Sequence, residues 1–496
     1  MKKMVGLAVV LAVLILGSYY GMGIVTERTL KKNIALLDQP NGWVLEVAEY
    51  KRGLYRSYAL LNTRLHIPAR TFKDSTGQDS TQPAVDIALK IPLDIYHGPI
   101  IFADSKWLFG LGYAHSVMTI PENYTDKFKE TFTADSTEPH LNLNIFISYL
   151  DNSSILSELP GFKLITTQEK KEFDWLGMTS DLQVTSHANH LQGQIKVDGM
   201  RFKDGMVTAT VGKTNVNYDL NRSKLAFYLG DADIFFPSMV VMNGEQKTFE
   251  LQNLDIHSSS HIQDDLLSSQ FKVKLDTLYN EGKSFGPAVL DVSISNLDAD
   301  TMVRINDQTN HMQQASEADR HTALLSMLPE LPKLVSKGAK FAVNELSIAT
   351  PEGLIKGNLL LSLPNATWDN PFQLIQSLVG DGKLTLSAAV VKKFLNDAAK
   401  IRLQNQVDAQ PVVLAPVASE ATPGAIPAPV DNGAVVVAAA PDVEQQAMAQ
   451  TDERLLKMVR SGLLLPEGSD YVIVFKLAGG QLTVNGKSFN PGMIQF

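Results

Sequence analysis

The first 26 residues contain the feature that most restricts how this chain can fold. After Lys2 and Lys3, the segment Met4–Thr26 runs for 23 positions without a charged side chain, and Glu27 ends it. At about 1.5 Å per residue, a helix of this length measures roughly 34 Å, enough to cross the roughly 30 Å hydrocarbon core of a bilayer. We therefore expect residues 1–26 to form one uncleaved transmembrane anchor.

Two other interpretations of this segment stay open. In a cleaved signal peptide, Val5–Leu16 would supply the apolar stretch and Gly17 and Ser18 the small residues near a cleavage site. The apolar run continues beyond that point through Tyr19–Val25, and its tyrosines suit a membrane interface, which favours the anchor. A buried helix of a soluble protein is the third interpretation.

Basic residues on both sides of the segment bear on its orientation. Lys2 and Lys3 favour a cytoplasmic N-terminus, whereas Arg28, Lys31 and Lys32 lie just beyond the other end. We expect the large body of the protein to be exported.

The composition narrows the classes of function. The 496 residues carry a net charge of −9, which argues against nucleic acid as a partner. There is no cysteine, so disulfides, thiolate metal sites and a cysteine nucleophile are excluded. The body must be held together by packing and strand pairing alone.

A period of two dominates the chain from Trp43 to about residue 300. Apolar and polar side chains alternate over Val85–Ile91, Leu141–Ile147 and Phe271–Leu275, the pattern of strands with one apolar face. Turn signals such as Asp204-Gly205 recur at strand-sized intervals. We predict an α+β fold dominated by an antiparallel sheet of hairpins and meanders, elongated or curved, with flanking helices. What covers its apolar face, whether a second sheet, helices or a ligand, is left open.

The second half of the body mixes helices and strands. Within a body spanning 27–406, helices are expected near 305–337 and 371–406, the latter as Pro371–Val379 and Ser387–Gln406. Strands are expected at Ala342–Ala349 and Leu354–Leu363.

The last ninety residues form two different regions. Residues 407–446 are rich in Pro, Ala and Val and are interpreted as a flexible linker, with partner docking or membrane contact as the alternative. Residues 447–496 are expected to form a helix and a β-hairpin that pack on the body.

One motif points towards catalysis. Gly282-Lys283-Ser284-Phe285-Gly286 has the spacing of the nucleophile elbow in α/β-hydrolases, where a strand-to-helix turn exposes the serine. Because an alternating strand follows Ser284, a hairpin turn explains the motif better.

Other short motifs indicate turns and solvated side chains. Gly212-Lys213-Thr214 and Gly486-Lys487-Ser488 lack the first glycine of a phosphate-binding loop. The histidine pairs 187/190 and 257/261 lack metal-ligand spacing in extended chain, and the acidic pairs 231/233, 264/265 and 298/300 lack the rest of a calcium loop. We predict no catalytic residue, no metal site and no cofactor.

Five blocks in order resemble the YdgA-like family, bacterial membrane-anchored proteins grouped under a domain of unknown function. The blocks are Tyr50-Lys51-Arg52-Gly53-Leu54-Tyr55-Arg56-Ser57, His97-Gly98-Pro99, Asn296-Leu297-Asp298, Leu346–Gly353 and Gly480–Lys487. The resemblance runs nearly end to end, and the Pro/Ala-rich tract at 411–441 departs from it by its length.

The resemblance implies a bacterial inner-membrane anchor with a periplasmic body, and it implies no reaction. Arg52 and His97 are candidate binding residues, although Gly53 and Gly98-Pro99 have structural explanations. We expect a non-enzymatic protein that binds an apolar, lipid-like ligand. The alternatives are a scaffold for envelope proteins and, less favoured, a serine hydrolase using Ser284; the oligomeric state is left open.

Overall fold

The computed structural model describes residues 2–37, 43–67, 70–73, 79–82, 84–225, 227–313, 328–368, 371–408 and 443–489. The predicted linker lies almost wholly outside these ranges. The α+β class and the predominance of antiparallel sheet are confirmed.

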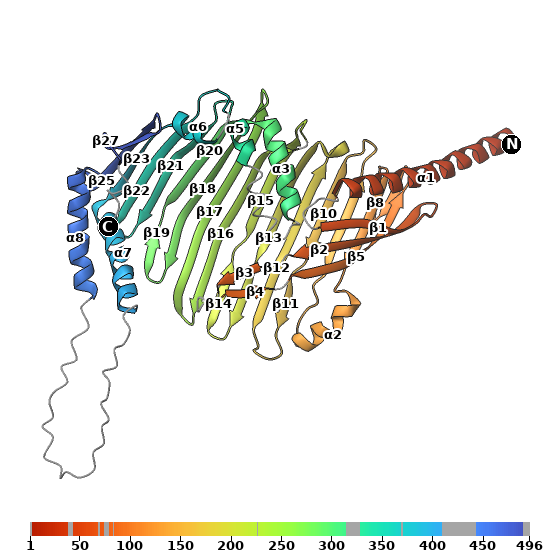
Figure 1. Cartoon of the computed structure of the whole chain (residues 1–496). Coiled ribbons are helices and arrows are strands. Elements are labelled where there is room, and N and C mark those ends of the chain that lie inside the picture. The colour runs from red at the N-terminus through yellow and green to blue at the C-terminus, as the bar shows by residue number, and fades with distance from the viewer. Residues whose placement is uncertain are drawn as a thin grey trace, which may run out of the picture.

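One antiparallel sheet contains most of the strands, and it follows the chain almost in order (Figure 1). Its first half comprises β1 (Trp43–Lys51), β2 (Arg56–Ile67), β5 (Val85–His97), β8 (Gly112–Met118), β9 (Leu141–Ile147), β10 (Ser153–Leu159), β12 (Glu172–Val184), β13 (His190–Asp204) and β15 (Thr214–Arg222). Its second half comprises β16 (Tyr228–Asn243), β17 (Gln246–Gln263), β18 (Leu266–Asn280), β20 (Ala288–Asp298), β21 (Lys340–Thr350), β22 (Gly353–Ser362), β23 (Val379–Ser387), β25 (Asp470–Ala478), β26 (Gln481–Val484) and β27 (Lys487–Ser488).

Short strands complete the ladders or form separate hairpins. Four of them pair within the large sheet, namely β11 (Phe162–Ile165), β14 (Val207–Val211), β19 (Lys283–Phe285) and β24 (Leu465–Glu467). Two hairpins stand apart from it, β3 (Arg70–Lys73) with β4 (Asp79–Gln82) and β6 (Ile101–Ala103) with β7 (Lys106–Leu108).

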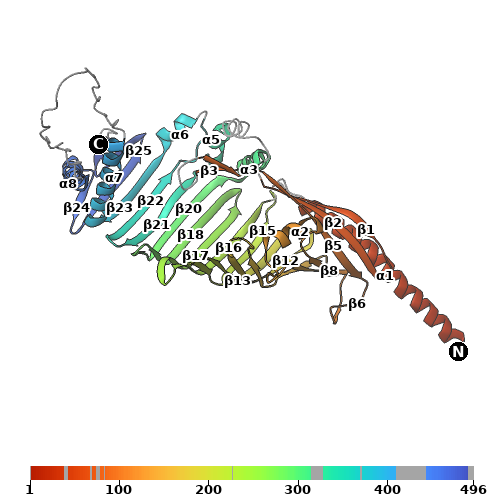
Figure 2. The ribbon, with the colours of Figure 1, turned by 90° about the horizontal axis from the view of Figure 1, so that it is seen from below.

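The helices lie at the ends and along the edges of the sheet. They are α1 (Lys2–Leu37), α2 (Glu122–Thr131), α3 (Ala299–Gln313), α5 (Leu331–Leu334), α6 (Pro371–Ser377), α7 (Ala388–Asp408) and α8 (Val443–Ser461), with the 3₁₀ turns η1 (Ser186–Ala188) and η2 (Leu328–Glu330). Figures 1 and 2 show α1 projecting from one end of the sheet while α7 and α8 pack at the other.

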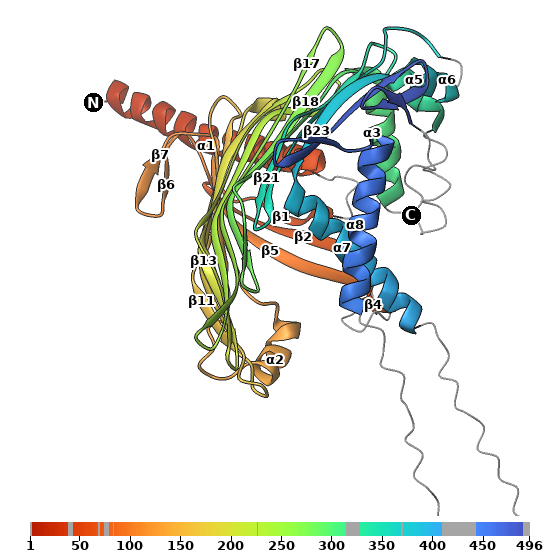
Figure 3. The ribbon, with the colours of Figure 1, turned by 90° about the vertical axis from the view of Figure 1, so that its left-hand side faces the viewer.

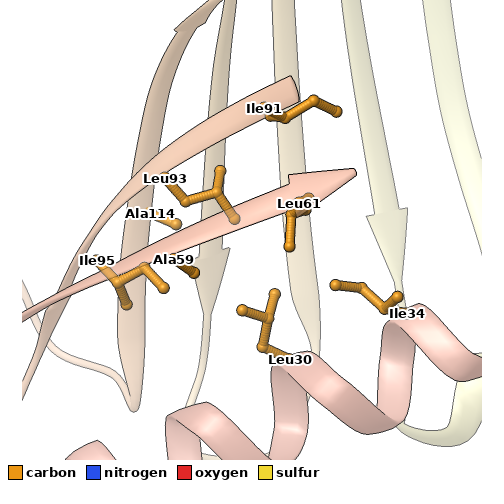
Figure 4. Close-up of a cluster of buried hydrophobic side chains, with 8 residues drawn as sticks. All are labelled: Leu30, Ile34, Ala59, Leu61, Ile91, Leu93, Ile95 and Ala114. Atoms are coloured by element: carbon orange, nitrogen blue, oxygen red, sulfur yellow. The ribbon is translucent and has the colours of Figure 1, made fainter. Parts of the chain in front are cut away.

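Helix α1 continues without a break from the apolar segment into the body and ends at Leu37, beyond the expected anchor of residues 1–26. Its Leu30 and Ile34 are buried against Ala59 and Leu61 of β2 and Leu93 of β5 (Figure 4). Within the residues that the structure describes, no helix combines the length and the apolar character needed to span a bilayer.

Some predicted boundaries are wrong. Strand β23 occupies the space between the predicted helices Pro371–Val379 and Ser387–Gln406 and also takes in Val379 and Ser387, which were predicted as helical. Gly380 and Gly382 look like turn residues, but a Cβ on Gly382 would lie 2.2 Å from the Phe475 ring, so the neighbouring strand requires glycine there. The helix expected within residues 447–496 begins earlier, at Val443, and ends at Ser461, and β24 follows it from Leu465.

Candidate functional site

The register of the sheet gathers apolar side chains on one face from end to end. Residues paired across an antiparallel ladder point to the same side, so a row can be followed from strand to strand. One such row, from β2 to β26, contains no charged residue: Ser57, Ile95, Ala114, Ile145, Ile155, Leu182, Gly193, Tyr218, Ala232, Ser258, Phe271, Val292, Val343, Leu359, Gly382, Phe475 and Val484.

The adjacent row points to the opposite face and is polar. It runs through Asp94, His115, Asn144, Leu156, Asp181, Gln194, Asn217, Asp233, His257, Lys272, Asp291 and Glu345. Neighbouring members bind one another: His257 Nδ1 lies 2.7 Å from Asp233 Oδ1, and Lys272 Nζ lies 3.1 Å from Asp291 Oδ2. The sheet therefore has one apolar face and, opposite it, a largely polar face, part of which the β6–β7 hairpin covers at Tyr113.

Helices cover the apolar face at the ends and at one edge. At one end lies α1, and at the other Val391 of α7 and Leu455 of α8 pack on Leu386 and Ile473. Along one edge, Leu334 of α5 packs beside the buried pair Leu267 and Leu297.

The middle of the same face is open to solvent. Ile234, Phe271 and Leu290, on β16, β18 and β20, are 37, 44 and 36% exposed. Figure 3 shows the sheet bending around the side on which α3, α7 and α8 lie. We call this concave apolar face, between its covered ends, the trough.

A second group of polar residues fixes α1 to the sheet. Arg52 forms an ion pair with Glu27 of α1, its Nε donating to Oε2 at 3.1 Å, and Lys31 Nζ donates to the other carboxylate oxygen at 2.7 Å. The hydrogen bonds from Lys31 and then from Arg52 hold the pKa of Glu27 below its usual range.

His97 lies beneath α1 with 1% of its surface exposed, and its Nε2 is 2.8 Å from Ser57 Oγ. Burial lowers the pKa of His97, the Tyr19 backbone carbonyl opposes that shift, and the charge of Arg52 adds to it. Ser57 is only 3% exposed, so the pair forms a buried hydrogen bond between the start of β2 and the end of β5.

Small residues let the helix approach the sheet this closely. A Cβ on Gly23 would lie 2.6 Å from His97 Cε1, one on Gly98 would lie 2.1 Å from the Tyr19 ring, and one on Gly112 would lie 2.7 Å from Thr26 Cγ2. By contrast, Gly21 has open space around its Cα. The structure thus brings the predicted residues Arg52 and His97 together at the foot of α1, where both orient the helix; a binding role for them stays a prediction.

The other candidate motifs are scattered over the sheet. Ser284 lies in β19, paired with Tyr279 of β18, and another strand follows it rather than a helix. His190 binds Asp219 at 2.8 Å on the polar face, far along the sheet from His97. Among the described residues, no group of three or more carboxylate or imidazole side chains is arranged to hold a metal ion.

The sequence analysis missed Ser57 and Glu27 as the partners of His97 and Arg52, as well as the continuity of the trough. Alternation in each strand indicated an apolar face, but only the register joins the faces of successive strands. The small residues of the helix, Gly23 and Thr26, were the available signal for the close packing of α1.

Comparison with known proteins gives a family without an assigned activity. The family described as "Bacterial protein of unknown function (DUF945)" matches residues 1–492, which confirms the resemblance to the YdgA-like proteins. No curated protein and no solved structure matches the chain.

The close packing at Gly23 predicts opposite effects for two glycine substitutions in α1. Gly21→Ala should raise the midpoint of thermal unfolding slightly, because alanine favours a helix by up to about 1 kcal/mol. Gly23→Ala should lower it, because the new methyl group has no space beside His97.

Docking of α1 can be measured with a disulfide. Since Cβ atoms at 26 and 112 would lie 3.6 Å apart, the pair Thr26→Cys and Gly112→Cys should form a disulfide when α1 is docked on the sheet. Its yield should fall with Gly23→Ala only; equal yields in both backgrounds would contradict this.

Acid should weaken the junction between α1 and the sheet. Because the folded-state pKa of His97 is lowered from 6.5, the unfolded chain binds a proton at higher pH, and stability falls as the pH drops below about 6.5. The unfolding midpoint should decrease from pH 7.5 to pH 5.5, and His97→Gln should flatten this decrease. An identical pH profile for the two chains would show that His97 does not carry the effect.

Proposed function

We propose that this chain, which belongs to the DUF945 family of bacterial proteins, is a non-enzymatic, membrane-anchored protein that binds lipid acyl chains in its trough. The observation that carries the proposal is the uncharged row of side chains that crosses the sheet from β2 to β26 on one face. A face of this kind is stable in water only if something apolar covers it, and the described helices cover its ends and one edge.

The dimensions and energetics of the trough suit acyl chains. From β9 to β22 there are ten steps between paired strands, which at roughly 4.8 Å each amount to about 48 Å. That exceeds the roughly 30 Å that two leaflets of acyl chains span in a bilayer. Burial of each methylene contributes about 0.8 kcal/mol, so a chain needs no polar partner to be retained.

The anchoring part of the proposal is supported by the uncharged residues of α1 that precede its contacts with the sheet at Tyr19, Gly23 and Thr26, and by the exposed apolar side chains there. Residues Val13, Leu14, Ile15 and Leu16 are all exposed where α1 projects beyond the sheet. Together with the bacterial family, these features favour the inner membrane, with the body in the periplasm.

Lipid binding can be tested with two adjacent residues of β16 on opposite faces. Ile234 lies in the trough and Phe235 on the polar face, and they are 37 and 39% exposed. The full chain should co-purify with phospholipid or fatty acid detected by mass spectrometry. Ile234→Lys should lower the bound lipid several-fold, because a charge in the trough must lose water when an acyl chain covers it.

Phe235→Lys is the matched control, since it adds the same charge opposite Asp255 on the polar face and should leave bound lipid unchanged. Absence of lipid from the parent chain, or an equal loss in both variants, would refute acyl-chain binding in the trough.

Topology can be tested because the chain has no cysteine. A single Gln194→Cys on the polar face should react with a membrane-impermeant maleimide in intact bacterial spheroplasts. The protein should remain in the inner-membrane fraction, and deletion of residues 4–18, which precede the contacts of Tyr19, Gly23 and Thr26 with the sheet, should release it. Labelling only after lysis would place the body on the cytoplasmic side.

A further inference from the structure

The hairpin of β6 and β7 presents an aromatic pair to solvent while its other side is fixed to the sheet. Ile101 and Ala103 are buried against Tyr113 of β8. Between them, Phe102 points outwards and pairs across the hairpin with Trp107, with ring centroids 4.8 Å apart. These two large hydrophobic side chains are 55 and 68% exposed, respectively.

Two neighbouring turns carry exposed apolar side chains at the same end of the strands. Leu54 and Tyr55 lie in the turn between β1 and β2, and Tyr149 and Leu150 in the turn between β9 and β10. Because the meander reverses direction at each turn, these two turns and the hairpin between β5 and β8 share one end of the sheet. We call the surface formed by Leu54, Tyr55, Ile100, Phe102, Trp107, Phe109, Tyr149 and Leu150 the apolar platform.

Hydrogen bonds tie the platform to itself and to α1. Tyr149 Oη donates to the carbonyl oxygen of Pro99, and Tyr19 Oη of α1 donates to that of Ile100 at 2.8 Å. A cavity of about 350 Å³ opens between α1 and the hairpin, lined mainly by apolar and aromatic side chains such as Leu16, Tyr55 and Trp107, together with His97. Figure 3 shows the hairpin and the projecting part of α1 on the same side of the sheet.

We propose that the apolar platform inserts into the interfacial layer of a phospholipid bilayer, beside the point where α1 enters it. The inference rests on the proposed anchoring by α1 and is independent of lipid binding in the trough. Exposed apolar surface of this extent marks an interaction site, and tryptophan and tyrosine concentrate at the membrane interface.

Continuity with α1 identifies the bilayer as the occupant. The exposed side chains of Ile15 and Leu16 line the cavity together with Trp107, so the environment that surrounds this part of α1 also surrounds Trp107. An anchored helix would hold the platform at the membrane surface at a high effective concentration. Helix and platform together would fix the orientation of the body, whereas a helix alone would leave it free to tilt.

Trp107 can report on this contact directly. The full chain with Trp43, Trp175 and Trp368 replaced by Phe retains Trp107 as its one tryptophan, since the sequence contains 4. It would be reconstituted into phosphatidylcholine and phosphatidylglycerol vesicles with or without brominated acyl chains. Bromine near the headgroups should quench about half of the Trp107 emission, and bromine at the chain ends should quench less, as expected of an interfacial residue.

Two reference chains make the result interpretable. The chain that retains only Trp368, which lies near α6 at the other end of the sheet, should not be quenched. A chain with all four tryptophans replaced by Phe and with Leu14→Trp added reports insertion of α1 itself. If the Leu14→Trp chain is quenched and the chain that retains only Trp107 is not, the platform is overturned while the anchor stands. Quenching of neither chain would overturn both.

Phe102→Ser, made in the chain that retains only Trp107, tests whether the exposed face of the hairpin drives the contact. It should reduce the quenching of Trp107 at least several-fold. Because Phe102 faces solvent and Ile101 keeps the hairpin on the sheet, the unfolding midpoint should not change. Undiminished quenching would contradict a role for the aromatic pair, and neither result depends on the amount of lipid in the trough.

Discussion

The structure depends on the constancy of strand register over one very long antiparallel sheet. Residues paired across each ladder point to the same side of the sheet. The register between two strands therefore decides whether their apolar side chains lie on the same face. Where the ladder shifts, as between Asp291 and Val292 opposite β21, the apolar residues Leu346 and Val343 still face the trough. A slip of one residue would instead bring the charged row, with Asp233 and Lys272, onto the concave side.

In this single-layer sheet, the described helices bury only part of the apolar face. Most sheets bury their apolar face under a second layer, whereas here the described helices α1, α5, α7 and α8 pack only on its ends and one edge. Acyl chains in the trough would supply the missing layer, and they suit it because they need no directional contacts. The same reasoning explains why the polar face carries paired charges and amides: most of it remains in water.

The junction between α1 and the sheet transmits the position of the helix to the body. The ion pair of Arg52 with Glu27, the buried contact of His97 with Ser57 and the close approach at Gly23 all act over a short part of α1. Together these contacts form a rigid joint. The joint gives a structural reason for two of the blocks that resemble the family, Tyr50–Ser57 and His97-Gly98-Pro99. A rigid joint matters if the apolar platform around Trp107 is to meet a membrane at a set angle, because flexibility at the joint would let the body change its angle relative to α1.

The sequence by itself determined the class of fold, the alternation of apolar and polar side chains in the strands and the presence of an N-terminal helix, because these depend on local periodicity. It identified Arg52 and His97 as candidates but not their partners, which lie 25 and 40 residues away in the chain. It did not predict strand β23, in which Gly380 and Gly382 lie against the Leu361 and Phe475 side chains of neighbouring strands. Only the tertiary structure decided that the separate apolar faces form one open trough and that Phe102 and Trp107 point away from the core, because both depend on which strands meet and in which register.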